Sequence, residues 1–208
     1  MTLRYRLAVF DADGTLFDSA PGILASIHHT IETLGLPEIS EAQMRTHLGP
    51  QVDLAYHRSF GLEGERLQEA VRVHRTFNTE HGVKLCQMYD GMREMLDRLR
   101  SAGVKVAVAS LKPVPTLERL LELQGLEFDS VHGYTGNGES KGDLIRMCID
   151  DLGIPKEEAV MIGDTVPDRE GAEEAGVDFI PVTFGYGFKP EDGGAGDAET
   201  LERMILGN

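Results

Sequence analysis

The sequence predicts an α/β fold, in which a parallel β-sheet carries helices on both faces and an α-helical domain is inserted near its start. Three features of the chain predict it. Short apolar runs are continuous rather than alternating, as is typical of parallel strands buried on both faces. Helical patterns of about ten residues separate these runs. One long interval contains helical patterns only.

Five apolar runs are predicted to form the strands of the sheet, and the last one named is the weakest. They are LAVF at 7–10, VKVAVAS at 104–110, AVMIGD at 159–164, DFIPV at 178–182 and FDSVHG at 128–133. Four helices are predicted, and each lies between two of these strands along the chain, at residues 91–103, 114–125, 141–153 and 168–176. Apolar residues recur in each of these helices at helical spacing, which favours strands joined by crossover helices.

Residues 19–85 interrupt the alternation of strands and helices. They contain helical patterns at 20–35, 40–49 and 65–82 and no convincing strand. A helical domain inserted between the first and second strands is the simplest explanation. We therefore predict a helical cap at residues 19–85 and an α/β core formed by residues 1–18 and 86–208.

The composition is that of a globular, acidic chain. Its 208 residues are 41% hydrophobic and carry a formal charge of −15, which disfavours nucleic acid and anionic membranes as partners. Cys86 and Cys148 form no C-x-x-C pattern and fit a reducing compartment. The first residues contain too short an apolar run for a signal peptide, and no later run is long enough to span a membrane. We expect a soluble, cytoplasmic protein, and the sequence leaves its oligomeric state open.

Polar side chains stand where three of the predicted strands end. Asp11 follows the first strand, Ser110 ends the second along the chain, and Asp164 ends the run at 159–164. Ligands of open parallel sheets bind beyond the carboxyl ends of the strands, so we expect these side chains to meet. Asp13 follows Asp11 closely, and two carboxylates in one small space raise the cost of ionising each other.

The stretch DADGT has interpretations other than catalysis. An Asp-Gly pair is most often part of a turn. A calcium-binding loop does not fit, because Val9 and Ala20 would occupy positions that need oxygen ligands. The later stretch GNGESKGD does not fit a phosphate-binding loop or a dinucleotide-binding motif, because Ser140 and Lys141 stand where these motifs need glycine.

Metal-assisted phosphoryl transfer fits the residues at the strand ends. Mg²⁺ takes oxygen ligands, which the side chains of Asp11 and Asp164 and the backbone carbonyl of Asp13 can supply. The Asp11 carboxylate can attack phosphorus and form an acyl phosphate that water hydrolyses. Asp13 can protonate the leaving oxygen and later activate water. Ser110 and Lys141 are expected to bind the phosphoryl oxygens.

Four motifs follow one another along the chain. The first, D-x-D-G-T-L-x-D-S, occupies residues 11–19, and the second is a strand that ends in Ser110. The third is Lys141 at the start of a helix, and the fourth, G-D-x-x-x-D, runs from Gly163 to Asp168. In the order and spacing of these motifs the chain closely resembles the haloacid dehalogenase superfamily, in its phosphoglycolate-phosphatase-like branch with a helical cap.

The resemblance implies a Rossmann-like core, a cap at the position of the helical insert, and dependence on Mg²⁺. It implies that Asp11 is the nucleophile and Asp13 the general acid and base. The metal would be held by Asp11, the carbonyl of Asp13 and Asp164, with Asp168 bound to it through water.

Two positions depart from the pattern of this branch. Leu111 follows Ser110, where the branch often has Asn or Ser. If only the backbone N–H contacts phosphate there, Leu111 has no effect; if the side chain contributes in the branch, the affinity for phosphate falls. Gly142 follows Lys141, where the branch often has proline, which is expected to loosen the turn without removing the charge.

Substrate contacts are predicted near the first and second motifs and in the cap. The candidates are Gly14, Thr15, Leu111, Lys112, Arg45 and Gly49. Arg45 and Gly49 belong to a loop of the cap that is expected to face the site, whereas Lys112 alone is more simply interpreted as a surface lysine. Three further arginines of the cap are expected on a solvent-exposed helix face rich in Glu and Gln: Arg66, Arg72 and Arg75.

The resemblance implies a phosphomonoester hydrolase (phosphatase) that acts on a small phosphorylated metabolite, with 2-phosphoglycolate as the first candidate. A sugar-phosphate mutase of the β-phosphoglucomutase type shares all four motifs and differs in how its cap excludes water. A catalytically idle binding relative is disfavoured, because a binding protein has no need of both Asp11 and Asp13. A dehalogenase is disfavoured because the family's dehalogenases lack the second aspartate.

Overall fold

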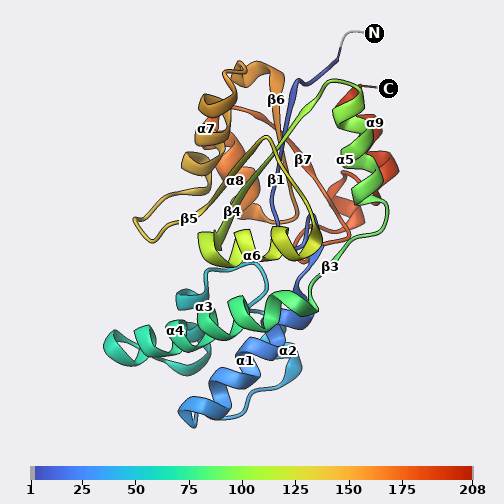
Figure 1. Cartoon of the computed structure of the whole chain (residues 1–208). Helices are drawn as coiled ribbons and strands as arrows, with labels where there is room; N and C mark the ends of the chain where they lie inside the picture. Colours follow the sequence, from blue (N-terminus) through green and yellow to red (C-terminus); the bar gives the residue numbers. More distant parts are fainter. Residues whose placement is uncertain (1–2, 208) are drawn as a thin grey trace.

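A five-stranded parallel sheet forms the centre of the computed structural model, which describes residues 3–207 (Figure 1). The strands lie in the order β5-β4-β1-β6-β7, so the first strand of the chain is the central one. Their bounds are β1 Leu7–Phe10, β4 Lys105–Pro113, β5 Ser130–Tyr134, β6 Ala159–Gly163 and β7 Asp178–Pro181. The five predicted strands are therefore confirmed, and β4 continues past its predicted end at Ser110, through a shift in its pairing with β5.

Helices cover both faces of the sheet, as predicted. On one face, Leu7 and Val9 of β1 pack in a cluster with α7 (Lys141–Leu152) and α8 (Val166–Ala175). On the other, Ala8 and Phe10 pack with α5 (Met92–Ser101), α6 (Val114–Gln124) and α9 (Ala198–Leu206). Successive side chains of a strand point to opposite faces, so each face of the short strand β1 is fully buried.

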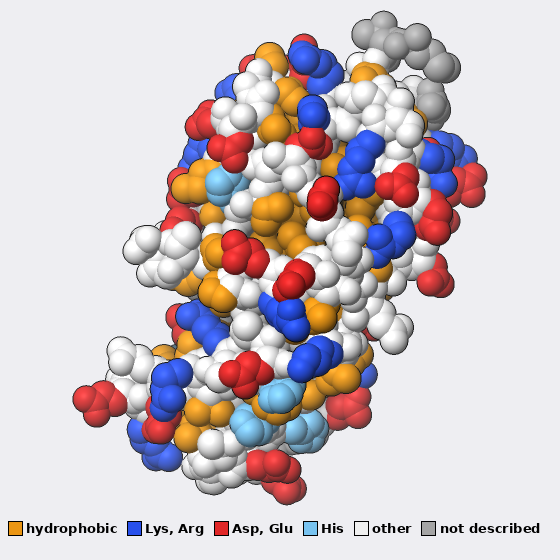
Figure 2. Space-filling view, in the orientation of Figure 1, with side chains coloured by type: hydrophobic (Ala, Val, Ile, Leu, Met, Phe, Trp, Pro, Cys, Tyr) orange, Lys and Arg blue, Asp and Glu red, His pale blue; other side chains and the backbone are white. Residues whose placement is uncertain are grey.

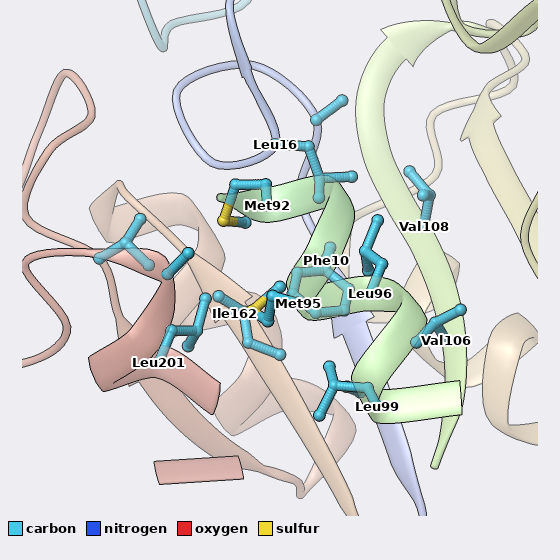
Figure 3. Close-up of a cluster of buried hydrophobic side chains, with 14 of the residues drawn as sticks. Phe10, Leu16, Met92, Met95, Leu96, Leu99, Val106, Val108, Ile162 and Leu201 are labelled. Atoms are coloured by element: carbon cyan, nitrogen blue, oxygen red, sulfur yellow. The ribbon is translucent and has the colours of Figure 1, made fainter. Parts of the chain in front are cut away.

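The larger of the two apolar clusters holds β1 in place. Figure 3 shows Phe10 together with Met95 and Leu96 of α5 and Ile162 of β6, all without solvent exposure. Burial of each such side chain stabilises the fold by about 1.5–3 kcal/mol. A strand fixed in this way gives the residue that follows it, Asp11, a defined position.

Four helices form the cap, which lies below the sheet and its covering helices in the view of Figure 1. They are α1 Ala20–Leu34, α2 Glu41–Arg45, α3 Val52–Phe60 and α4 Gly64–Glu80, and they share an apolar cluster around Tyr56. Helix α2 is shorter than the predicted 40–49, because the chain then enters a loop with Gly49 at φ 99 followed by Pro50. Helix α3 was not predicted at all.

The cap joins the core through a small antiparallel pairing that was not predicted. Strand β2 (Phe17–Asp18) lies near the end of the first motif, just before the chain enters the cap. It pairs with β3 (Gln87–Met88), where the chain returns from the cap. The two connections therefore lie side by side, and Phe17 of the first forms an isolated β-bridge with Asp13. The exact division at 18/19 and 85/86 stays a prediction.

The surface mixes charges of both signs. On the face shown in Figure 2, acidic and basic side chains are interspersed over the core and the cap. Cys86 and Cys148 are buried and not bonded to each other. Within residues 3–207, no helix combines the length and the apolar character that crossing a membrane requires.

Candidate active site

The predicted meeting of strand ends takes place at the carboxyl edge of the sheet. Phe10, the last residue of β1, pairs with Val108 of β4 on one side and Ile162 of β6 on the other. The backbone N–H of Asp11 donates to the carbonyl of Ile162 over 2.9 Å, which continues the ladder by one residue. This register brings Asp11, Ser110 and Asp164 to one edge, and all three are buried.

Lys141 forms the centre of a buried ion cluster. Its ammonium group contacts a carboxylate oxygen of Asp11 and lies 2.8 Å from Oδ1 of Asp168. Burial alone would lower the pKa of Lys141, but the charges of Asp11 and Asp168 raise it above its usual range. Lys141 is therefore a permanent cation beside Asp11, as its proposed role toward phosphoryl oxygens requires.

Gly142, one of the two departures from the branch, has a packing role. A Cβ on this residue would lie 2.6 Å from Cδ of Glu174 in α8. The side chain of Glu174 also accepts a hydrogen bond from Ser140 over 3.0 Å. Glycine after Lys141 thus allows α7 to start in close contact with α8, and a proline would meet this side chain.

Asp13 is held by two polar side chains. Its Oδ2 lies 2.8 Å from Nζ of Lys112, and its other oxygen accepts a hydrogen bond from the hydroxyl of Ser19. The interpretation of Lys112 as a surface lysine is wrong, since its side chain is only 3% exposed. Burial would lower the pKa of Lys112, yet the charge of Asp13 raises it. No pattern in the sequence indicates this contact, because Lys112 belongs to β4 whereas Asp13 follows β1.

Asp164 lies in a space that two glycines keep open. Gly14 has a φ of 84, and a Cβ there would lie 2.3 Å from Oδ2 of Asp164. A Cβ on Gly185 would lie 2.4 Å from Cβ of the same aspartate. The carboxylate accepts a hydrogen bond from the backbone N–H of Tyr186 over 2.7 Å, and the Thr15 hydroxyl lies 3.4 Å from it. Gly14 and Thr15 therefore lie against Asp164.

The three buried carboxylates can hold a divalent cation. Oxygen atoms of Asp11, Asp164 and Asp168 all lie within 4.8 Å of one another. Burial raises the pKa of Asp11 to about 6, although Lys141 lowers it, and burial with the charge of Asp11 raises the pKa of Asp164 to about 7. One lysine cannot neutralise three carboxylates, and hard oxygen ligands are those that Mg²⁺ prefers. The cluster thus fits Mg²⁺.

A cavity of about 130 Å³ lies between this edge of the sheet and the cap. The core contributes the catalytic candidates Asp11, Asp13, Ser110 and Lys141, together with Leu111, Lys112 and Asp168. The cap contributes His47, Gly49, Gln51, His74, Arg75 and Asn78, among others. The loop after α2 thus faces the cavity, as predicted.

Two arginines of the cap differ from their predicted places. Arg45 does not line the cavity; its side chain is 56% exposed and pairs with Glu41 one turn earlier on α2. Arg75, expected on a solvent-exposed face, lines the cavity instead. On the surface of α4, Asn78 is a neighbour of both His74 (i, i+4) and Arg75 (i, i+3), and all three line the cavity. The sequence contains this spacing, but the spacing does not tell which face of the helix meets the core.

A family model supports the assignment that the motifs suggested. The model for haloacid dehalogenase-like hydrolases matches residues 8–182, which include all four motifs. The chain belongs to this family. The phosphoglycolate-phosphatase-like branch is also represented among its relatives, in agreement with the resemblance.

The relatives of this haloacid dehalogenase-like chain bear different names. The tyrosine-protein kinase PtkA of Mycobacterium tuberculosis is 37% identical over 187 residues, which are 88% of this chain but only 63% of PtkA. Its solved structure has a TM-score of 0.78, at 34% identity, over 88% of this chain and 86% of that one. A 5'-nucleotidase of Pseudomonas aeruginosa is 32% identical over 91% of this chain and 87% of its own. A phosphoglycolate phosphatase of Agrobacterium fabrum is 32% identical over 86% and 81%.

Proposed function

We propose that the protein is a Mg²⁺-dependent phosphatase that hydrolyses a small phosphate monoester through an aspartyl-phosphate intermediate. The observation that carries the proposal is the placement of Asp11 in the cavity beside Lys141, with Asp13 two residues further along the chain. A nucleophile, a fixed cation and a second acid then face the same small volume. Two relatives named as a nucleotidase and a phosphatase support the same reaction class.

The reaction divides into two displacements at phosphorus. In the first, an oxygen of Asp11 forms a bond to phosphorus and the ester oxygen leaves with its electron pair, taking a proton from Asp13. In the second, Asp13 takes a proton from water, whose oxygen attacks phosphorus and releases Asp11 and inorganic phosphate. Lys141 and Ser110 bind the phosphoryl oxygens in both steps.

Asp11, Asp164 and the carbonyl of Asp13 would hold the Mg²⁺, with Asp168 bound through water. When bound, the metal neutralises charge on the phosphoryl group and on the clustered carboxylates. Asp168 has a second role toward Lys141, since it lies 2.8 Å from the ammonium group and accepts a hydrogen bond from Thr165 over 2.6 Å. Asp168 therefore fixes the position of the Lys141 ammonium group.

Phosphate release from a panel of esters tests the proposed function. The panel contains 2-phosphoglycolate, a nucleoside 5'-monophosphate, a hexose 1-phosphate and p-nitrophenyl phosphate, each with Mg²⁺. We expect net hydrolysis of the compact esters, with one phosphate released per ester consumed. Conversion of the hexose 1-phosphate to its 6-phosphate, with little phosphate released and a need for a bisphosphate primer, would establish the mutase alternative instead.

Protein-tyrosine kinase activity is a second candidate, because PtkA is 37% identical to this chain. The chain spans 63% of PtkA, and the cavity of about 130 Å³ is small for a nucleoside triphosphate. We therefore expect no transfer of label from γ-labelled ATP to a tyrosine-containing peptide. Transfer that Asp11→Asn abolishes would favour the kinase.

The Asp13→Asn variant is expected to lose more activity toward esters with poor leaving groups than toward esters with good ones. Its backbone carbonyl, and so its contribution to metal binding, is unchanged, but the amide cannot donate or accept the proton. For alkyl phosphates we expect a loss in kcat of roughly 10²- to 10⁴-fold. The loss is expected to be smaller for p-nitrophenyl phosphate, whose leaving oxygen needs less protonation. An equal loss for both kinds of ester would assign Asp13 another role.

Removal of the metal is expected to abolish hydrolysis. Chelation should silence the protein, Mg²⁺ should restore it and Ca²⁺ should not. Ca²⁺ accepts more oxygen ligands at longer distances, so it allows both oxygens of Asp11 to bind and lowers the reactivity of this nucleophile. The measurement is phosphate release in chelator, followed by titration with either ion. Full activity in excess chelator would contradict the metal assignment.

A further inference from the structure

Arg75 is the one formally charged residue that the cap contributes to the cavity wall, among residues 3–207. The two lysines of the same cavity already have carboxylate partners, Lys112 with Asp13 and Lys141 with Asp11 and Asp168. Arg75 is in none of the salt bridges found in the described part of the chain, although the protein contains 35 acidic residues. Its Nε is buried and has no hydrogen-bond acceptor.

The position of Arg75 is fixed from two sides. Its guanidinium group lies over the ring of Tyr134, at the end of β5, with 5.9 Å between the central carbon and the ring centroid. One turn later on α4, the hydroxyl of Thr79 hydrogen-bonds to that of Thr116 in α6 over 2.6 Å. The core therefore holds both the guanidinium group and the helix that carries it. A buried N–H donor held in this way, without an acceptor, indicates that a ligand supplies one.

The other polar groups of the cap wall are uncharged. Burial lowers the pKa of His74 to about 3, and the charges of Lys112 and Arg75 act in the same direction. Burial also lowers the pKa of His47. Nε2 of His47 forms a hydrogen bond with the hydroxyl of Ser59 over 2.8 Å, and the buried Nδ1 of His47 has no hydrogen-bond partner. The cap wall thus offers a single positive charge next to a neutral imidazole.

We propose that Arg75 determines substrate specificity by binding a carboxylate at the end of the substrate remote from its phosphoryl group. The inference rests on the proposed function. A single charge matches a carboxylate better than the double charge of a second phosphate. The planar guanidinium group can meet the two carboxylate oxygens with Nε and one terminal nitrogen, which is the geometry of bidentate arginine–carboxylate pairs. The substrate is then a phosphorylated short-chain carboxylic acid.

Titration calorimetry with two phosphonates tests this assignment without any turnover. 3-Phosphonopropionate carries a phosphonate and a carboxylate, whereas propylphosphonate lacks the carboxylate; both are titrated into the full chain with Mg²⁺. We expect the first to bind the unaltered protein tighter by roughly 10- to 100-fold, the usual effect of a charge-assisted pair. In Arg75→Gln this preference should fall to about one, and in Arg75→Lys, which keeps the charge but not the planar donor pair, it should be intermediate.

Arg72→Gln is the matched control. Arg72 lies on the same helix, but its side chain is 71% exposed and lies 3.6 Å from Glu69, outside the cavity. This variant should keep the full preference for the carboxylate. Thermal unfolding verifies that each variant is folded, and Arg75→Met, which keeps an apolar stem against Tyr134, replaces Arg75→Gln if the latter does not fold.

The outcomes separate the two proposals. Equal affinity of the unaltered protein for both phosphonates, or an unchanged preference in the Arg75 variants, overturns the role of Arg75 even if esters are hydrolysed. A preference that disappears with Arg75 supports the role even if no ester is hydrolysed, in which case only the proposed reaction fails. Failure of both phosphonates to bind overturns both.

Discussion

The Asp11→Asn variant is expected to lose hydrolysis almost entirely while it keeps its fold. The amide has nearly the shape of the carboxylate but cannot attack phosphorus. Loss of a nucleophile that acts together with its neighbours lowers kcat by about 10⁴-fold or more. Folding should persist because Asp11 continues the strand through its backbone N–H, which the change leaves in place, and Lys141 keeps Asp168 as its partner. Phosphate release and thermal unfolding measure the two effects.

Asp18→Asn provides the control within the same motif. The Asp18 carboxylate accepts hydrogen bonds from the backbone N–H of Ala20 and the hydroxyl of Tyr186, both over 3.1 Å, and it does not line the cavity. Its loss of activity should be far smaller than that of Asp11→Asn. Appreciable turnover by Asp11→Asn, in a sample that mass spectrometry shows free of deamidation, would rule out the covalent route.

The Lys141→Met variant is expected to lose both activity and stability. The change removes the cation between Asp11 and Asp168 and leaves two buried carboxylates near each other. Removing one partner of a buried ion pair lowers the free energy of unfolding by about 3–5 kcal/mol. Activity should fall by about 10²- to 10³-fold, since a donor to the phosphoryl oxygens is lost. Denaturant unfolding in chelator, and phosphate release with Mg²⁺, measure the two losses.

The pH dependence identifies the cause of this loss of stability. Without Lys141, the destabilisation is greatest at high pH, where the carboxylates are ionised, and shrinks as the pH falls and they take up protons. Lys105→Met is the matched control, because Lys105 lies 2.6 Å from Asp129 but is 54% exposed, and an exposed pair contributes less than about 1 kcal/mol. Similar losses in the free energy of unfolding of the two variants at every pH would show that the cluster around Lys141 contributes no more to stability than an exposed ion pair.

The sequence alone determined the central part of the fold and the residues that meet there. Continuous apolar runs such as residues 7–10, bounded by polar residues and alternating with helical patterns, indicate strands buried on both faces, and parallel strands bring their carboxyl ends to one edge. The amino-acid pattern was therefore sufficient to place Asp11, Ser110 and Asp164 together. The reason is local: each stands directly after, or at the end of, a strand whose direction the pattern fixes.

Only the tertiary structure decided which side chains of the cap and of the neighbouring loops reach the cavity. Arg72 and Arg75 lie less than one turn apart on α4, yet one is exposed and the other lines the cavity, because the face of a helix that meets the core depends on how the helix packs. Lys112 points inward because Asp13, far away in the sequence, supplies its partner. Such contacts join residues of different elements, so their physical cause is the packing of the cap on the core and not the spacing of residues along the chain.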